Sequence, residues 1–206
     1  IVAVGLVFLL AITGCAQKPA AQPEGPIKIG LQGPITGKYA YEGEGFVKAV
    51  TLLVDQVNAK GGVLGRKIEL ITGDDKGDPK ESALVAQKMV SSGVVAVIGA
   101  YNTTATEPAS DIYNEAGILH ITPSSTATKL TTKGYKRFFR TCFLDDRQGL
   151  FAAGFIAETL GAKKAAIIHD NSTYAKGLAD WTKKYVEEKG VSVVFFDAIT
   201  PGESDF

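Results

Sequence analysis

The feature that most constrains the fold is an alternation of short apolar runs with helical patterns, which begins at Ile27. Seven runs are strand candidates: IKIGLQGP, KIELITGDD, VVAVIGA, ILHITPSS, RFFRT, KAAIIHD and VSVVFFDAI. Runs such as VVAVIGA lack alternation between polar and apolar residues, as expected of strands in a parallel sheet covered by helices on both faces. The β-α-β-α order therefore predicts an α/β fold with a mostly parallel sheet flanked by helices.

Two intervening segments carry apolar residues at spacings of three and four, the period of an amphipathic helix. The first covers residues 43–60, ends at the glycines of NAKGG, and has the apolar positions Phe46, Val50, Leu53 and Val57. The second ends at EKG and has the apolar positions Tyr174, Leu178, Trp181 and Tyr185. A further helix start is predicted in DPKE, where Asp78 can cap, Pro79 suits the first helical position and Glu81 can close a capping box.

Hydroxyl-bearing residues follow two of the predicted strands. After VVAVIGA, Thr104 is predicted to cap a helix, with Glu107 three residues later. This helix would begin at the carboxyl edge of the sheet, where ligands bind, and its free N–H groups with the hydroxyls of Thr103 and Thr104 suit a carboxylate. Capping alone would account for one threonine. The next strand ends in a second hydroxyl cluster, Ser124, Ser125 and Thr126, which we expect at the same edge.

Gly43-Glu44-Gly45 resembles part of a dinucleotide fingerprint, but its context does not fit nucleotide binding. The fingerprint needs its glycines directly after the strand and a third glycine that packs the helix on the sheet. Here Gly43 follows Gly33 only ten positions later, and Lys48 occupies the third position. The loop between these glycines instead carries Tyr39, Tyr41 and Glu42, which would suit one wall of a small-molecule pocket.

Residues 1–15 form an apolar run that ends in small residues and Cys15, a pattern typical of a targeting segment. The sequence ITGC resembles the lipobox of bacterial lipoproteins, in which Cys15 would carry lipid and become the new N-terminus. An ordinary secretory peptide or a short buried helix remain alternatives, while the run is too short to span a bilayer of about 30 Å. We therefore expect an exported, lipid-anchored protein, periplasmic or at the cell surface.

Residues 16–26, AQKPAAQPEGP, are rich in Pro, Ala and Gln and have no apolar period. This composition predicts a flexible tether between the anchor and a folded body. If Cys15 is lipidated, Cys142 is the second of only two cysteines and has no intrachain partner. Cys142 is then expected to be a buried small hydrophobic residue, and packing must supply the stability.

Composition and motifs argue against several classes of function. The 22 basic residues balance 22 acidic ones, so no net charge would attract a nucleic acid. His120 and His169 lie in or at the end of apolar strands without a third metal ligand, and a structural role is predicted for both. The spacing of Asp74, Asp75 and Asp78 lacks the pattern of a calcium loop. The sequence has no G-x-S-x-G elbow, P-loop or H-E-x-x-H motif, so we expect no enzymatic activity, metal or cofactor.

Several segments together carry a family resemblance: GPITGKYAYEGEGFVKAV, VNAKGGVLGRKIEL, DDKGDP, TEPASDIYNEAGILHITPSSTA and HDNSTYAKGLA. The chain resembles the periplasmic branched-chain amino-acid-binding proteins of ABC importers from about Ile27 to Phe206. This resemblance implies a two-lobed type I periplasmic binding protein, in which two α/β lobes close on the ligand by a hinge motion and nothing is catalysed.

The resemblance also implies roles for individual residues. Thr103 matches the hydroxyl donor to the ligand carboxylate, Ser124 a backbone contact, and Thr126 a partner of the ligand ammonium. Tyr174 matches an aromatic residue from the second lobe, and Tyr41 is the expected aromatic residue near Gly43. Some members have a first-lobe disulfide, whose positions here are occupied by Gly77 and Asn102.

The chain departs from the family pattern where it ends, at PGESDF. We interpret it as an N-terminal fragment, with an incomplete first lobe at residues 27–142 and the start of a second lobe at residues 143–206. The part beyond would include an acidic residue that pairs with the ligand ammonium in the family. We expect a lipoprotein that captures a small amino acid, with leucine, isoleucine or valine favoured, and delivers it to an ABC permease. A sensor or amide receptor on the same fold is the alternative, and an exported enzyme is less favoured.

Overall fold

The computed structural model describes residues 25–204 of the chain. The predicted leader with Cys15, and most of the predicted tether, lie outside the described residues. The strands are β1 (Ile27–Gly33), β2 (Ile68–Asp74), β3 (Ala96–Ile98), β4 (Leu119–Thr122), β5 (Phe138–Arg140), β6 (Lys164–His169) and β7 (Ser192–Ala198). The helices are α1 (Ala40–Ala59), α2 (Pro79–Ser91), α3 (Thr103–Glu115), the 3₁₀-helix η1 (Thr128–Thr131), α4 (Asp145–Gly154), the π-helix η2 (Phe155–Thr159) and α5 (Thr173–Glu188).

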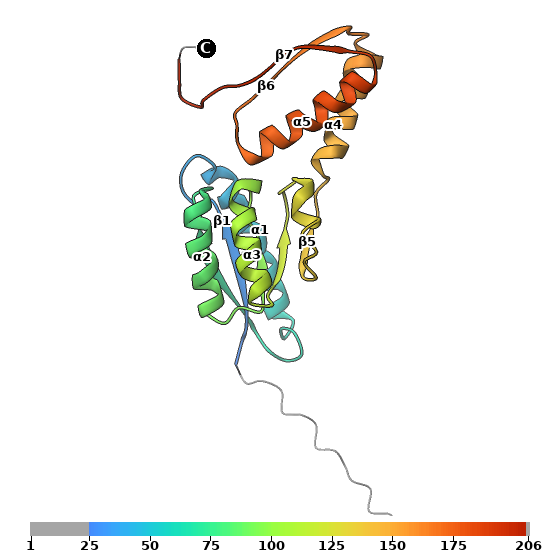
Figure 1. The fold of residues 1–206 in the computed structure, drawn as a ribbon. Helices are drawn as coiled ribbons and strands as arrows, with labels where there is room; N and C mark the ends of the chain where they lie inside the picture. The colour runs from blue at the N-terminus through green and yellow to red at the C-terminus, as the bar shows by residue number, and fades with distance from the viewer. Residues whose placement is uncertain (1–24, 205–206) are drawn as a thin grey trace, which may run out of the picture.

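The first five strands form one parallel sheet in the order β2-β1-β3-β4-β5 (Figure 1). Strand β1 lies between β2 and β3, and pairs with β2 from Ile27 opposite Ile68 to Gly33 opposite Asp74. Because all strands run the same way, the loops that follow them meet at one edge. The predicted α/β class and all seven predicted strands are confirmed.

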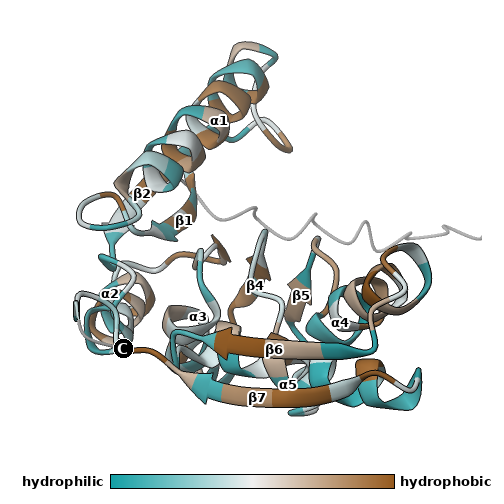
Figure 2. Cartoon of the chain, turned by 90° about the horizontal axis from the view of Figure 1, so that it is seen from above, coloured by the Kyte–Doolittle hydropathy of each residue, from teal (hydrophilic) through white to brown (hydrophobic). Residues whose placement is uncertain are grey.

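Helices α2 and α3 cover one face of this sheet, and α1 lies on the other (Figure 2). The face under α2 and α3 holds the main buried cluster, which consists of Ala86, Met89, Val94, Val97, Ala109, Tyr113 and Ile118. Glycines in the strands let α2 approach closely, because a Cβ at Gly30 would lie 3.0 Å from Met89 Sδ and one at Gly73 would lie 2.8 Å from Met89 Cε.

Helix α1 begins at Ala40, three residues before the predicted start, and only Gly43 in it is buried. The predicted apolar stripe is half-buried at Phe46, Val50 and Val57 but exposed at Leu53. A Cβ at Gly43 would lie 2.1 Å from the Pro34 carbonyl oxygen. This glycine is therefore required by close packing of α1 on the loop after β1, which accounts for it without a phosphate ligand.

The second unit contains α4, η2, α5 and the parallel pair β6-β7, and lies beyond the carboxyl edge of the first sheet (Figure 1). Its buried cluster is Ala153, Val186 and Val191. A Cβ at Gly149 would lie 2.9 Å from the Cβ of Trp181, so this glycine permits the close packing of α4 on α5. Among residues 25–204, no helix combines the length and apolar character needed to cross a membrane.

Local features of the sequence were predicted with mixed success. Asp78 caps α2 as predicted, accepting from the amides of Lys80 (2.8 Å) and Glu81 (3.0 Å). The expected capping box does not form, because the Asp78 amide donates to the Asp75 carbonyl at 2.8 Å while the Glu81 carboxylate pairs with Lys76 at 3.4 Å. Cys142 is half-buried where full burial was predicted, because the chain leaves the first sheet at this point.

The two histidines have the structural positions that their apolar surroundings predicted. His120 is buried between Tyr113 and Phe138, whose ring centroids lie 4.9 and 5.0 Å from its own. Its Nε2 contacts the Gly99 carbonyl oxygen at 2.6 Å, and burial lowers the pKa of His120 to about 4. The ring is therefore neutral at physiological pH. His169 is buried against Phe196, with 5.5 Å between the ring centroids.

Candidate functional site

A small cavity of about 170 Å³ lies at the carboxyl edge of the first sheet, where the second unit meets it. It is lined by residues of the loops after β3 and β4 and by the first turn of α5: Tyr101, Asn102, Thr103, Ser124, Thr126 and Tyr174. The structure thus brings together four of the six predicted ligand-binding residues, although they are separated by as much as 71 positions in the sequence (174 minus 103).

Thr103 is the first residue of α3, and its side chain is 1% exposed. Within residues 25–204, neither its hydroxyl nor that of buried Thr126 has a hydrogen-bond partner. Buried polar groups are nearly always paired, so these two hydroxyls can offer hydrogen bonds to whatever occupies the cavity. The cavity is therefore suited to a small ligand that carries charged or polar groups.

The helix cap beside Thr103 differs from the prediction, and Thr104 as the N-cap is wrong. Helix α3 begins at Thr103, and the side chain of Asn102 caps it by accepting from the amide of Ala105 at 3.1 Å. Asn102 is as good a cap as threonine and lies two residues before Thr104, where the chain is still extended. Thr104 is half-buried and does not line the cavity, while the hydroxyl of Thr103 is free of any capping role.

The loop after β4 is fixed to the loop after β3 by hydroxyl groups. Ser124 and Ser125 both donate to the carbonyl oxygen of Tyr101, the latter at 3.2 Å. Thr122 donates to the Ala100 carbonyl at 2.9 Å, and the hydroxyls of Ser125 and Thr106 are 2.5 Å apart. These hydrogen bonds hold the loop after β4 in place at the wall of the cavity.

Asp145 is a residue of interest that sequence reasoning missed. It is the first residue of α4, its side chain is 1% exposed, and its amide donates to the Thr126 carbonyl at 3.0 Å. Its Oδ1 has no hydrogen-bond partner among the described residues. Burial raises the pKa of Asp145, and the nearby Thr126 hydroxyl and, less strongly, the Arg140 guanidinium oppose this rise. Two adjacent acids opening a helix were the available signal, but first-turn acids are common at helix starts and did not single it out.

Asp145 also lines a polar cleft of about 410 Å³ next to the cavity. One side of the cleft is residues 127–129, which follow the loop after β4, and the other is α5 with the turn before it. A Cβ at Gly177 would lie 3.1 Å from Asp145 Oδ2, so Gly177 keeps α5 close to this carboxyl group. The only tryptophan of the sequence, Trp181, also lines the cleft.

The aromatic wall of the cavity differs from the one expected from the loop before α1. Tyr41 is 90% exposed and does not line the cavity, but lines a neighbouring hollow on α1 that shares Tyr101 with it. Tyr101 lines the cavity together with Tyr174, and its ring lies 5.7 Å from the centroids of both Tyr39 and Phe46. Sequence reasoning missed Tyr101, although its place directly after a buried strand was a usable signal.

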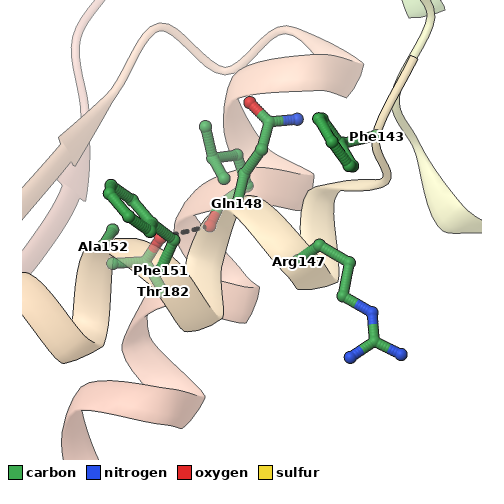
Figure 3. Close-up of a pocket in the computed structure, with 7 residues that line it drawn as sticks. Phe143, Arg147, Gln148, Phe151, Ala152 and Thr182 are labelled. Atoms are coloured by element: carbon green, nitrogen blue, oxygen red, sulfur yellow. Dashed lines mark hydrogen bonds between the residues drawn. The ribbon is translucent and has the colours of Figure 1, made fainter.

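An apolar groove with a volume of about 560 Å³ lies between α4 and α5. Figure 3 shows the rings of Phe143 and Phe151 on either side of Gln148, and both phenylalanines are 79% exposed. Its other lining residues include Leu178 and Thr182, whose hydroxyl donates to the Leu178 carbonyl at 2.8 Å. The groove lacks the convergent buried polar groups of the smaller cavity, which is therefore the better candidate site.

Comparison with known proteins agrees with this assignment of the fold. The chain is 42% identical over 197 residues to the leucine-, isoleucine-, valine-, threonine- and alanine-binding protein of Pseudomonas aeruginosa, covering 96% of this chain and 52% of the relative. It is 42% identical over 180 residues to the Leu/Ile/Val-binding protein of Escherichia coli K12, covering 87% of this chain and 49% of the relative. The chain thus spans about half the length of these relatives.

Solved structures show the same architecture. The isoleucine complex of LivJ from Streptococcus pneumoniae superposes with a TM-score of 0.79 and 35% identity, over 88% of this chain and 51% of that one. A solute-binding protein from Rhodopseudomonas palustris in complex with benzoate gives a TM-score of 0.77 and 27% identity, over 88% and 50%. The model of the periplasmic binding protein family matches residues 26–206. The chain belongs to the periplasmic binding protein family.

Proposed function

We propose that this chain is part of a solute-binding protein that recognises the charged groups of a small amino acid with a branched aliphatic side chain and delivers it to an ABC permease. The observation that carries the proposal is the pair of buried, unpartnered hydroxyls of Thr103 and Thr126 in one cavity. The branched side chain is inferred from the relatives, whose names specify leucine, isoleucine and valine. The proposal includes no catalytic step, in keeping with a family of solute-binding proteins.

The ligand carboxylate is assigned to the start of α3. The free N–H groups and the macrodipole of a helix N-terminus favour an anion. Thr103 adds a hydroxyl donor at this point, and Asn102 leaves that hydroxyl free by capping the helix itself. A hydrogen bond to a charged group contributes about 1.5–3 kcal/mol, more than a neutral one.

The ligand ammonium is assigned to Thr126 and Asp145. The Thr126 hydroxyl can accept a hydrogen bond. The carboxyl group of Asp145 is held nearby, because the Asp145 amide donates to the Thr126 carbonyl. An ammonium group would supply the partner that Asp145 Oδ1 lacks and would favour its ionised form. Tyr174, from the first turn of α5, covers this cavity from the side of the second unit. Binding would then draw the two units together.

An aromatic acid is the second candidate ligand, because structural neighbours of this chain bind benzoate and 4-hydroxybenzoate. Those ligands share a carboxylate with leucine but have no ammonium. The unpartnered carboxyl oxygen of Asp145 favours an amino acid, because an ammonium can pair with that oxygen and a benzoate ring cannot.

Titration calorimetry on the full-length protein can separate these ligands. Leucine is compared with 4-methylpentanoate, which lacks the ammonium, with isopentylamine, which lacks the carboxylate, and with benzoate. We expect leucine to bind at least roughly tenfold more tightly than each of the others, since each lacks one charge-assisted contact. Equal binding of leucine and isopentylamine would contradict the carboxylate assignment. Tighter binding of benzoate than of leucine would favour the second candidate.

Localisation and anchoring are a separate part of the proposal. A binding protein that supplies an importer acts outside the cytoplasmic membrane, and the ITGC sequence supports a lipid on Cys15. With the native leader present, Cys15→Ser is expected to move the protein from the membrane fraction to the soluble exported fraction. If the variant stays with the membrane after a high-salt wash, Cys15 is not the anchor.

A further inference from the structure

Asp75 is an acidic residue with a fully buried side chain in the loop between β2 and α2. Its Oδ1 accepts a hydrogen bond from the Gly77 amide at 2.9 Å, and its Oδ2 accepts one from Gln32 Nε2 at 3.3 Å. Its own amide donates to the Gly33 carbonyl at 3.0 Å, which ties the loop to the end of β1. Both carboxyl oxygens are therefore used inside the first unit, away from the ligand cavity.

The first of these contacts leads to the start of α3. The Gly77 carbonyl accepts from Asn102 Nδ2 at 3.1 Å, and Asn102 Oδ1 accepts from the Ala105 amide at 3.1 Å. Gly77 has a φ of 73°, and a Cβ there would lie 3.1 Å from Asn102 Nδ2. The close contact therefore depends on glycine. Through it, the Asp75 carboxylate helps to fix Asn102, the residue directly before Thr103.

The second contact leads to the same helical turn by a different route. Gln32 Nε2 donates to Ser82 Oγ at 2.6 Å, and Ser82 Oγ donates to the Ala105 carbonyl at 2.6 Å. Tyr113 of α3 donates its hydroxyl to Gln32 Oε1, which fixes the orientation of the amide. The two routes from Asp75 thus end at the amide and at the carbonyl of Ala105.

We infer that Asp75 is a positioning residue for the carboxylate-binding end of the site, acting through Gly77 and Asn102 on the first turn of α3. The inference rests on the proposed function, because it assigns the start of α3 to the ligand carboxylate. Helix N-terminal amides bind an anion only when they point at it, so an orientation held by buried hydrogen bonds favours binding. Asp75 does not touch the ligand in this account.

The protonation state of Asp75 gives the inference a distinct pH signature. The titratable groups that face it are Asp74 and Asp78 on its own loop and Tyr113 from α3. Burial raises the pKa of Asp75 to about 6. Below that pH one oxygen carries a proton and can no longer accept as before, so the positioning of α3 should weaken. We therefore expect protonation of Asp75 to lower the affinity for the ligand as the pH falls from 7 to 5.

Protonation of Asp75 should raise the stability of the fold, whereas it should lower the affinity for the ligand. The folded-state pKa of about 6 lies above the ordinary value of 3.8. The contribution of Asp75 to stability is therefore fully present below the ordinary value and is lost as the pH rises through about 6. A role limited to packing would make any loss of affinity follow a loss of stability. A positioning role makes the two move in opposite directions.

The test uses Asp75→Asn in the full-length protein, with Asp78→Asn as the matched control. Asparagine presents a donor where the carboxylate accepts, so one of the two contacts is lost, whereas Asn at position 78 keeps the cap of α2. We expect leucine affinity to fall roughly two- to thirtyfold in Asp75→Asn. The control should bind as the wild type does. The difference in affinity between wild type and Asp75→Asn should shrink from pH 7 to pH 5.

A second variant keeps the inference testable if Asp75→Asn does not fold. Asn102→Ser retains a helix cap but has no amide to donate to the Gly77 carbonyl, so leucine affinity should fall with little change in the unfolding midpoint. Wild-type affinity in both folded variants would overturn the positioning role while leaving the proposed function intact. If the wild type itself does not bind leucine, the proposed function fails first.

Discussion

The two faces of the first sheet are packed very differently. On one face, α2 and α3 bury Met89, Ala109 and Tyr113 in a continuous cluster. On the other, α1 buries only Gly43 and leaves Leu52 and Leu53 each 58% exposed. The candidate ligand residue Thr103 belongs to the well-packed face, because it begins α3. The comparison shows that one helix supplies both core and site, so its first turn is held rigidly where a ligand carboxylate would bind.

The largest expected effect tests this difference in packing directly. Met89→Ala removes a side chain that fills the space above Gly30 and Gly73, and should lower the free energy of unfolding by about 2–5 kcal/mol. Leu53→Ala on α1 is the matched control and should change it by less than about 0.5 kcal/mol, because the side chain is largely exposed. Urea unfolding of both variants measures the comparison. Equal losses would mean that the two faces contribute alike.

A smaller effect is expected at the edge of the cavity. Asp145→Asn removes the charge proposed to pair with the ligand ammonium and should weaken leucine binding by about 1.5–3 kcal/mol. Because burial raises the pKa of Asp145, its ionised form opposes folding at neutral pH, so the variant should be no less stable than the wild type at pH 7. Calorimetry with leucine and 4-methylpentanoate measures the effect. A similar loss for both ligands would contradict an ammonium partner.

Loss of the cap of α2 should lower stability without lowering ligand affinity. Asp78→Ala removes two hydrogen bonds to the first turn of α2 and should cost about 1 kcal/mol of stability. Helix α2 does not line the cavity, so leucine affinity is expected to stay within roughly twofold of the wild-type value. Thermal unfolding and calorimetry on the same samples provide both numbers. A tenfold loss of affinity would show that the site depends on α2 as well as α3.

The smallest effect is expected on α1. Tyr41 is almost fully exposed and does not line the cavity, so Tyr41→Ala should change neither stability nor leucine affinity beyond experimental error. Tyr101→Ala is the informative partner, because Tyr101 lines the cavity and packs against Tyr39 and Phe46. A clear loss of binding in Tyr41→Ala alone would show that Tyr41, and not Tyr101, is the aromatic residue that contacts the ligand.

The strands and their order were predictable because buried parallel strands leave uninterrupted apolar runs, and the loops that follow them must share an edge. The hydroxyls of Thr103 and Thr126 were found in this way. The N-cap was not, since Asn102 and Thr104 have similar preferences and only the backbone conformation decides between them. Tyr101 was missed for a comparable reason, because several aromatic residues border the site in sequence and side-chain direction selects among them.

Asp145 shows a different limit of sequence reasoning. Acidic residues in the first turn of a helix are common on exposed surfaces, and neighbouring Asp146 has the same local context. The burial of Asp145 depends on the close approach of α5. Gly177 permits that approach, and it lies 32 positions later in the sequence (177 minus 145). The unequal packing of α1 and α3 has the same origin. Helix α1 carries an apolar stripe, whereas the buried residues of α3 include Thr106 and Ser110, so tertiary contacts determine that α3 is the helix that is covered.

A calorimetric cycle tests whether Thr103 binds the ligand carboxylate. Leucine and isopentylamine are each titrated into the full-length wild type and into Thr103→Ala. The account predicts that the substitution weakens leucine binding roughly ten- to hundredfold and leaves binding of the amine, which has no carboxylate, nearly unchanged. Equal losses for the two ligands, or wild-type leucine affinity in Thr103→Ala, would contradict it.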